Sequence, residues 1–227
     1  MLSRQGIRHL RVTALLNDTT ATLLALPGAR LALICGTGVN TAAFLPTRLL
    51  HARKLPAAAA AHTHVVVNTE CSMLGAGIFP LAAADVALDA AADLPGFQPL
   101  EQLVGGRYLG EIARRALGTP SERWSMRSEN DGEDEHAREV VARVRERAGA
   151  FVAAMVAAFV DVLGERGALV VACAGAVIEG PVGAVTQRWL DELTGAGRVR
   201  LVVVEDAGLV GAAVAAVKEV ETVKAML

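Results

Sequence analysis

Short apolar runs, each followed by polar residues, recur along the chain and predict the strands of a sheet. They cover residues 11–16, 30–35, 64–68, 168–174 and 198–204. Their aliphatic and β-branched side chains are typical of strands that are buried on both faces. The first three runs end at polar groups that begin with Asn17, Gly36 and Thr69. Open α/β sheets bind their ligands at such strand ends, so we expect a site there.

Segments with helical apolar spacing alternate with these runs. They cover residues 81–94, 100–117, 138–163 and 186–193, and a last Ala-rich helix begins near Val210. Pro95 and Gly96 separate the first two segments. Residues 118–138 are mostly polar and acidic, which indicates an exposed loop. Strands followed by helices predict an α/β layered fold, and we expect a single domain over residues 1–227.

The composition excludes several classes of function. The chain has 227 residues, of which 53% are hydrophobic and 4% aromatic, so disorder throughout is excluded. The 22 basic residues nearly balance the 24 acidic ones, for a net charge of -2. This charge provides no field to hold nucleic acid or an anionic membrane, and we expect neither as a partner.

The cysteines and the apolar runs predict a cytoplasmic protein. Cys35, Cys71 and Cys173 form no C-x-x-C pair, which argues against a disulfide framework and favours a reducing compartment. The longest uncharged apolar run, residues 148–160, is too short for the roughly 20 residues that span a bilayer. We also expect no metal site, because His62 and His64 have no third ligand near them.

The polar groups at the strand ends each have an ordinary structural explanation as well as a chemical one. Gly36-Thr37-Gly38 can bring free amides close to a phosphate, but an isolated Gly-Thr-Gly also fits a plain turn. Asp18 can be a helix cap, and Glu70 and Glu101 can be surface acids. The residues alone therefore do not decide between the structural and the chemical explanation.

The order of four motifs identifies a resemblance. They are Asn17-Asp18-Thr19, Gly36-Thr37-Gly38-x-Asn40, Asn68-Thr69-Glu70, and Pro95-Gly96-Phe97-Gln98-Pro99-Leu100-Glu101 followed by Gly106-Arg107-Tyr108-Leu109-Gly110-Glu111. In this order they resemble the hexokinase family, and especially its fungal-type branch. The resemblance is specific from Val12 to Leu117 and loose from Glu139 onward. It implies the ribonuclease H-like, actin-like large lobe of a hexokinase.

The resemblance implies the phosphorylation of a glucose-type hexose by ATP, a reaction of glycolysis. Asp18 matches the general base that takes the proton of the primary hydroxyl. Asn17, Asn40, Glu70 and Glu101 match residues that, with Asp18, bind the sugar. Carboxylates and amides suit a polyol, because a hydroxyl both donates and accepts hydrogen bonds.

The resemblance also implies a nucleotide side. Gly36, Thr37 and Gly38 match the family's second phosphate loop. Gly106-Arg107 matches a nucleotide contact, and Gly175 matches the glycine of an Asp-Gly-Ser/Thr string in the adenosine site. We expect Mg²⁺ to be carried by the nucleotide phosphates and not by a protein metal site.

Several departures from the family pattern lead us to expect an incomplete enzyme. The family places a smaller lobe before the Asn-Asp-Thr string, and only 16 residues precede Asn17 here. We therefore expect the chain to lack that lobe, or to need a partner chain in its place. Cys71 stands where the family has Trp, and Ala174 and Ala176 flank Gly175 in place of the acid and the hydroxyl. We expect the hexose half-site to be retained and the ATP site to be weakened.

Two other functions remain open. The first is a catalytically inactive regulator or sugar-binding module on the same lobe. The second is an N-acetylglucosamine kinase, because the hydroxyl ligands are shared and the residues that select for the second sugar carbon are not identifiable.

Overall fold

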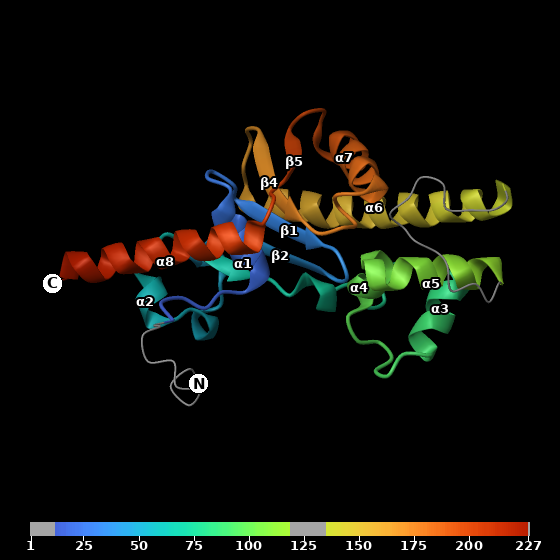
Figure 1. Ribbon diagram of the computed structural model, residues 1–227, viewed down its shortest axis with the longest axis horizontal. Helices are drawn as coiled ribbons and strands as arrows, with labels where there is room; N and C mark the ends of the chain where they lie inside the picture. Colours follow the sequence, from blue (N-terminus) through green and yellow to red (C-terminus); the bar gives the residue numbers. More distant parts are fainter. Residues whose placement is uncertain (1–11, 119–134, 227) are drawn as a thin grey trace.

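The computed structural model describes residues 12–118 and 135–226, and a five-stranded sheet lies at the centre of this part of the chain (Figure 1). The strands stand in the order β3-β2-β1-β4-β5. Their bounds are β1 Leu31–Cys35, β2 Val39–Pro46, β3 His64–Asn68, β4 Leu169–Ala174 and β5 Val199–Val203.

The sheet is mixed. β1 and β2 form an antiparallel hairpin in which Cys35 faces Val39, and β2 pairs antiparallel with β3. On the other side of β1, β4 runs parallel to it and β5 runs parallel to β4. The carboxyl ends of β1, β4 and β5 therefore meet at one edge of the sheet, where the Gly36-Thr37-Gly38 turn also lies.

Four of the five predicted strands are confirmed, as β1, β3, β4 and β5. The strand predicted at residues 11–16 is wrong. Residues 12–16 belong to no helix or strand, and Leu15 is 94% exposed. Arg11 lies outside the described residues. Apolar, β-branched composition does not suffice for a strand, because a strand also needs a neighbour to pair with.

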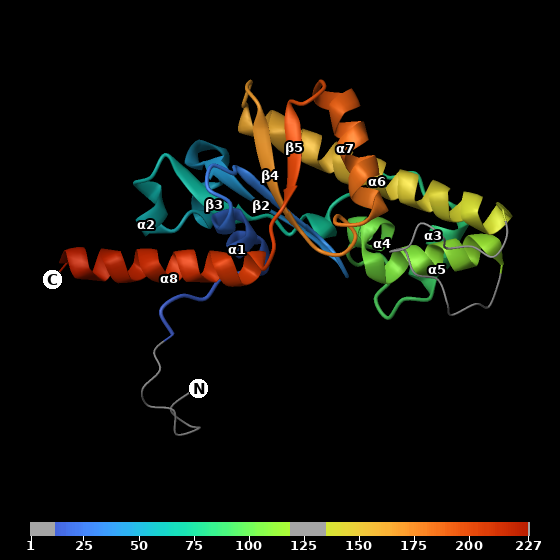
Figure 2. The same cartoon turned by 45° about the horizontal axis from the view of Figure 1, so that its top comes forward.

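Helices cover both faces of the sheet. They are α1 Asp18–Ala25, α2 Ala57–Ala60, α3 Ala83–Ala90, α4 Pro99–Val104, α5 Gly106–Leu117, α6 Glu135–Leu163, α7 Pro181–Thr194 and α8 Ala207–Met226. α6 packs against α7, and α1 packs against α8 (Figure 2). No described helix is long and apolar enough to cross a membrane.

Successive side chains of β1 point to opposite faces of the sheet, and each face has its own hydrophobic core. Leu31, Leu33 and Cys35 are buried in the larger core, which includes Val152 and Val156 of α6. The intervening Ala32 belongs to a smaller core on the other face, with Leu23 of α1, Ala42 and Ala172. Small alanines at those positions let α1 lie close to the sheet, which brings its N-terminus near the end of β1.

Several predicted helical boundaries are corrected. The segment expected over residues 81–94 is helical only in α3, and the segment expected over 186–193 is part of the longer α7. The helix expected over residues 100–117 is divided at Gly105, which has extended backbone and precedes α5. A side chain at Gly105 would meet the backbone of Glu101 and Thr37, at 2.8 Å and 2.9 Å from their oxygens. The exposed loop expected over 118–138 ends earlier, because α6 already begins at Glu135. Its residues 119–134 lie outside the described part of the chain.

Candidate active site

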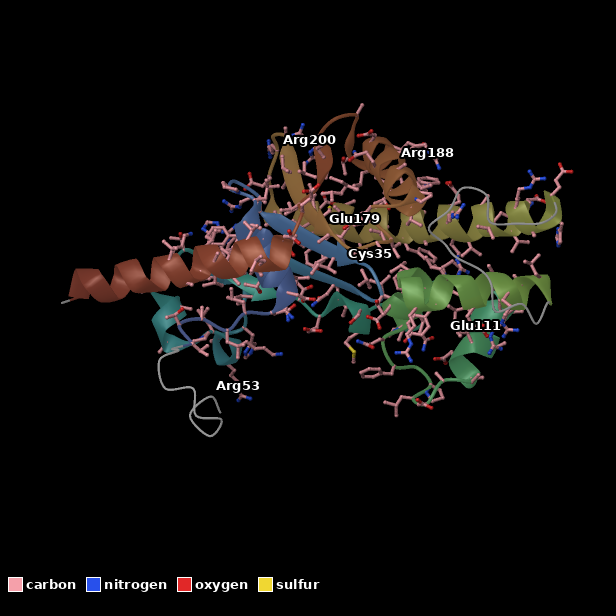
Figure 3. The ribbon with its side chains drawn as sticks, viewed as in Figure 1. Cys35, Arg53, Glu111, Glu179, Arg188 and Arg200 are labelled. Carbon is pink, nitrogen blue, oxygen red and sulfur yellow. The ribbon has the colours of Figure 1, made fainter. Side chains whose placement is uncertain are left out.

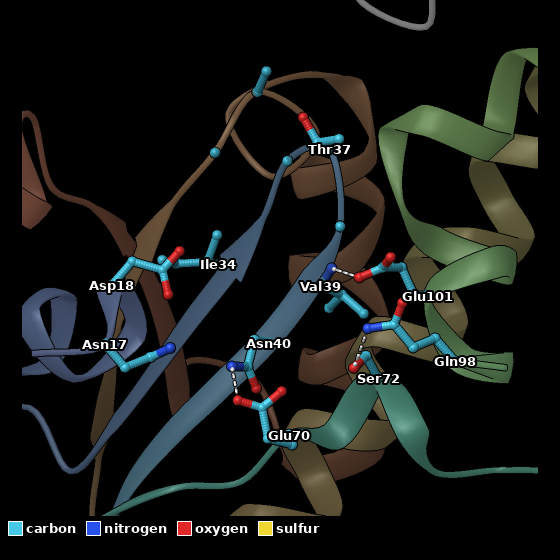
Figure 4. A pocket seen from close by; sticks show the side chains of 14 residues that line it. Asn17, Asp18, Ile34, Thr37, Val39, Asn40, Glu70, Ser72, Gln98 and Glu101 are labelled. Atoms are coloured by element: carbon cyan, nitrogen blue, oxygen red, sulfur yellow. Dashed lines mark hydrogen bonds between the residues drawn. The ribbon is translucent and has the colours of Figure 1, made fainter.

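A pocket of about 580 Å³ opens at the carboxyl end of β1 (Figure 4). It is lined by Asn17, Asp18, Ile34, Gly36, Thr37, Gly38, Val39, Asn40, Glu70, Ser72, Gln98, Glu101, Gly175 and Ala176. We call it the first pocket. It brings together nine of the eleven site residues expected from the sequence, although they come from five separate segments.

The start of α1 provides one wall of the first pocket. Asn17 is the N-cap of α1, and its Oδ1 accepts the amide proton of Thr19 at 2.9 Å. Asp18 follows as the first helical residue, and its Oδ1 also accepts from that amide, at 2.8 Å. The capping function expected as the alternative for Asp18 thus belongs mainly to Asn17. Both side chains remain exposed at the pocket.

β2 and the end of β3 provide the floor. Asn40 projects from the second position of β2, and Glu70 follows β3 by two residues. The Asn40 amide nitrogen lies 3.5 Å from Oε1 of Glu70. The backbone of Glu70 is left-handed, with a φ of 50°, which is uncommon for a residue other than Gly. Such strain is concentrated at functional sites.

The start of α4 provides the opposite wall, with two side chains that face the pocket. Glu101 lies in the first turn of α4, and its Oε2 accepts the amide proton of Val39 at 3.3 Å. Gln98 precedes the helix with a φ of 52°, and its Nε2 donates to the buried Ser72 hydroxyl at 3.4 Å. The amide group of Gln98 is thereby directed along the pocket wall (Figure 4).

Sequence reasoning missed Gln98 and Ser72 as pocket residues. Gln98 lies inside a motif that carried the resemblance, three residues before Glu101, and that spacing was a usable signal. Ser72 gave none, because its position depends on the turn that Glu70 begins.

A glycine turn provides the roof. The Gly36 amide donates to the Gly38 carbonyl at 2.9 Å and closes the turn between β1 and β2. Within the described residues, the amides of Thr37 and Gly38 donate to no other group. Gly175, with a φ of +111°, packs against this turn, and a Cβ there would lie 2.7 Å from the Cys35 carbonyl oxygen. Free amides on a glycine turn can donate to phosphate oxygens.

Gly106 and Arg107 do not line the first pocket and instead support the glycine turn from behind. The Gly106 amide donates to the Gly36 carbonyl at 2.7 Å, and the Arg107 amide donates to the Thr37 carbonyl at 3.1 Å. The Arg107 guanidinium lies 5.8 Å from the Tyr108 ring centre. The contact of these residues with a nucleotide stays a prediction.

A second pocket of about 850 Å³ joins the first at Asp18 and Ile34, which line both. Its other lining residues are Thr22, Ala174, Glu179, Val203, Val204, Glu205, Asp206, Ala207, Gly208 and Leu209. It lies between the ends of β4 and β5 and the start of α8. None of the described residues that line either pocket is Lys, Arg or His. A polyanion would therefore depend on backbone amides and on a cation that it brings with it.

The described residues contain no group of three or more His, Cys, Asp or Glu side chains that could hold a metal ion. The three cysteines are free and buried (Figure 3 labels Cys35). Burial raises the pKa of the Cys35 thiol to about 12, and burial raises that of Cys173 to about 12 as well. Both thiols are therefore protonated at neutral pH, and neither is a nucleophile for this site.

Comparison with protein families gives a match to the hexokinase family model over residues 30–124 and 119–218. Hexokinase-1 of Oryza sativa subsp. japonica is 39% identical over 122 residues, which are 51% of this chain and 24% of that protein. Hexokinase-2, chloroplastic, of Nicotiana tabacum is 40% identical over 123 residues, 51% of this chain and 23% of that protein. The matches thus span about a quarter of the length of these relatives.

Solved structures share the fold. A crystal structure of a hexokinase superposes with a TM-score of 0.75 at 24% identity, over 95% of this chain and 57% of that one. A hexokinase from Schistosoma mansoni complexed with glucose also gives 0.75, at 23% identity, over 90% of this chain and 57% of that one. A ROK hexokinase from Thermus thermophilus gives 0.56 at 21% identity, over 91% of this chain and 65% of that one. The expected α/β fold is confirmed, and the single-domain assignment stays a prediction.

Proposed function

The chain belongs to the hexokinase family, and from this membership and the geometry of the two joined pockets we propose that it takes part in phosphorylating a hexose at its primary hydroxyl with ATP. The observation that carries the proposal is the position of Asp18, which lines both pockets. A base at this junction can contact a sugar hydroxyl on one side while a phosphate approaches from the other.

The first pocket suits the sugar. Asn17, Asn40, Glu70 and Glu101 offer carboxylates and amides from three walls, and Gln98 adds a further amide. Each hydroxyl of a hexose can donate to a carboxylate or exchange hydrogen bonds with an amide. The Schistosoma mansoni relative was solved with glucose, which favours glucose as the first sugar to test.

The reaction forms a bond between the hydroxyl oxygen and the γ-phosphorus, and breaks the bond from that phosphorus to the bridging oxygen of ADP. The hydroxyl proton passes to the Asp18 carboxylate. The free amides of Thr37 and Gly38, on the turn closed by Gly36, are suited to bind phosphate oxygens as charge moves onto them. Mg²⁺, when bound with ATP, would neutralise part of the phosphate charge. The described residues that line the two pockets include no Lys, Arg or His that could do so.

The direct experiment is an assay of ADP release with glucose, mannose and N-acetylglucosamine, together with calorimetric titration of glucose. We expect turnover with at least one sugar. Asp18→Asn should lower turnover by about 10²- to 10⁴-fold, because it removes the base, while glucose still binds. Asp161→Asn, a substitution at an exposed position of α6, is the matched control. It should change neither the turnover nor the glucose binding.

Each other outcome has a defined meaning. Equal turnover by wild type and Asp18→Asn would contradict the assigned base. Glucose binding without turnover by the wild type would favour the sugar-binding module over the kinase. Turnover only with N-acetylglucosamine would favour the amino-sugar kinase.

We also propose a cytoplasmic location, which is supported by the three free, buried thiols. Fractionation of cells that express the tagged chain tests this, and recovery of the chain from an oxidising compartment would contradict it.

A further inference from the structure

The side chain of Asn68, the last residue of β3, connects three segments that line the first pocket. Its Oδ1 accepts from Nδ2 of Asn40 at 2.8 Å and lies 3.4 Å from the hydroxyl oxygen of the buried Thr19. Its Nδ2 donates to Oε1 of Glu70 at 2.5 Å. Asn68 itself does not line the first pocket. Any effect on a bound sugar must therefore pass through its neighbours.

The chemistry of these neighbours determines the orientation of the Asn68 amide. A carboxylate only accepts hydrogen bonds, so the atom that faces Glu70 must be the nitrogen. The oxygen then faces Asn40 and the hydroxyl of Thr19. Thr19 donates its one hydroxyl proton to Oδ1 of Asn17, so the same cluster reaches the wall formed by α1.

Glu70 depends on this support more than an ordinary surface acid does. It is exposed and has left-handed backbone, with a φ of 50°. An exposed glutamate without partners samples many rotamers, and fixing it costs conformational entropy. The hydrogen bond from Asn68 fixes the carboxylate before a ligand arrives, which lowers that cost.

We propose that Asn68 is a positioning residue that orients the Asn40 amide and the Glu70 carboxylate for the hexose, without contacting the hexose itself. The inference rests on the proposed function, because it assigns the first pocket to a sugar. It requires a side chain that both donates and accepts. Alanine does neither, and an ionised aspartate only accepts.

Glucose affinity, measured by calorimetry on the full chain at several pH values, tests the proposal. Asn68→Ala should weaken glucose binding by about tenfold, the usual effect of losing one or two hydrogen bonds at a binding site. Thr69→Ala is the matched control on the neighbouring residue. Thr69 bonds to the hydroxyl and the carbonyl of Thr41, and not to a pocket residue. It should lower the melting temperature and leave glucose affinity unchanged.

Asn68→Asp gives a readout that a purely structural role would not change. The introduced carboxylate faces Glu70 at neutral pH, and the two like charges raise the pKa of the pair. Binding should be weak at about pH 7.5 and recover towards about pH 5, where a shared proton restores the donor. The other carboxylates of the pocket, Asp18 and Glu101, are common to both chains, so the ratio of variant to wild-type affinity isolates the new pair.

The outcomes separate this inference from the proposed function. If wild type binds glucose and both Asn68 variants bind it equally well, the positioning role is overturned and the hexose site remains. If Asn68→Asp is weakened equally at all pH values, the positioning role is also overturned. If wild type does not bind glucose at millimolar concentration, both the hexose site and the positioning role are overturned. Circular dichroism of each variant confirms that it is folded.

Discussion

Gly38 lies directly against the carboxylate of Glu101, so that a Cβ at position 38 would overlap its Oε2 and Cδ atoms. The glycine turn thus has a second function besides exposing amides. The absence of a side chain at Gly38 leaves the space in which Glu101 reaches the pocket and accepts from the Val39 amide.

Gly38→Ala should therefore weaken glucose binding by about ten- to a hundredfold, because the added methyl group displaces a carboxylate that makes charge-assisted hydrogen bonds. Calorimetric titration measures the effect. Gly167→Ala is the matched control, since a Cβ at Gly167 meets nothing within 4 Å, and it should leave the affinity unchanged. Wild-type affinity in Gly38→Ala would mean that Glu101 contributes nothing to the site.

A buried ion pair between α3 and α6 should make a large contribution to the stability of the fold. Arg147 of α6 donates to both oxygens of Asp85 of α3, at 2.6 Å and 2.8 Å, and the Asp85 side chain is only 3% exposed. Asp85→Ala leaves the guanidinium without its carboxylate partner. It should lower the free energy of unfolding by about 3 kcal/mol in urea titration.

Two further variants check this interpretation. Asp93→Ala, at an exposed position, should change stability little. The double variant Asp85→Ala/Arg147→Ala should lose less than the sum of the two single variants, because the two residues act as a pair. Additive losses would contradict the pairing.

The cysteines should not react in the folded chain. The thiol pKa values of Cys35 and Cys173 are each raised to about 12, and burial also raises the pKa of Cys71. At about pH 8 a thiol with such a pKa is ionised to roughly one part in 10⁴, and the thiolate is the reactive form. Ellman's reagent should therefore label all three cysteines in concentrated urea and none in buffer. Rapid labelling of Cys35 or Cys173 in the folded chain would show that the sheet opens at its centre.

Much of the sheet could be predicted because its strands are apolar runs with clear ends. The predicted run at residues 64–68 has the same bounds as β3. β2 could not be predicted in this way. Its first residues, Val39 and Asn40, belong to the Gly36-Thr37-Gly38-x-Asn40 motif, and its identity as a strand depends on pairing with β1 and β3. Pairing is a long-range property that local composition does not contain.

The candidate site was predictable through the resemblance to hexokinases and not from the residues alone. The resemblance selected Asp18, Asn40, Glu70 and Glu101, and all four line one pocket. Asn68 was not predicted, because its role lies in contacts with side chains 28 and 49 residues away. Such contacts exist only once the sheet has formed.

The last prediction concerns pH and the packing of α6 on α7. Arg188 donates to both carboxylate oxygens of Glu146, at 2.7 Å and 2.5 Å, and the Trp189 ring nitrogen donates to one of them at 2.7 Å (Figure 3 labels Arg188). The hydrogen bond from Arg188, and then that from Trp189, hold the pKa of Glu146 below its usual range. The folded state therefore favours the charged carboxylate. Its stabilising effect is present above the ordinary glutamate pKa and is lost as the pH falls through the lowered value.

Because the Glu146 side chain is 42% exposed, this effect is screened, and we expect about 0.5–1 kcal/mol. Glu146→Gln should be less stable than wild type by that amount at about pH 7, and the difference should disappear near pH 3. Urea titrations at both pH values measure it. Glu192→Gln is the matched control, since Glu192 lies 3.8 Å from Arg188 and is 55% exposed, and its difference should be small at both pH values. An equal loss for Glu146→Gln at both pH values would mean that Glu146 contributes through packing and not through its charge.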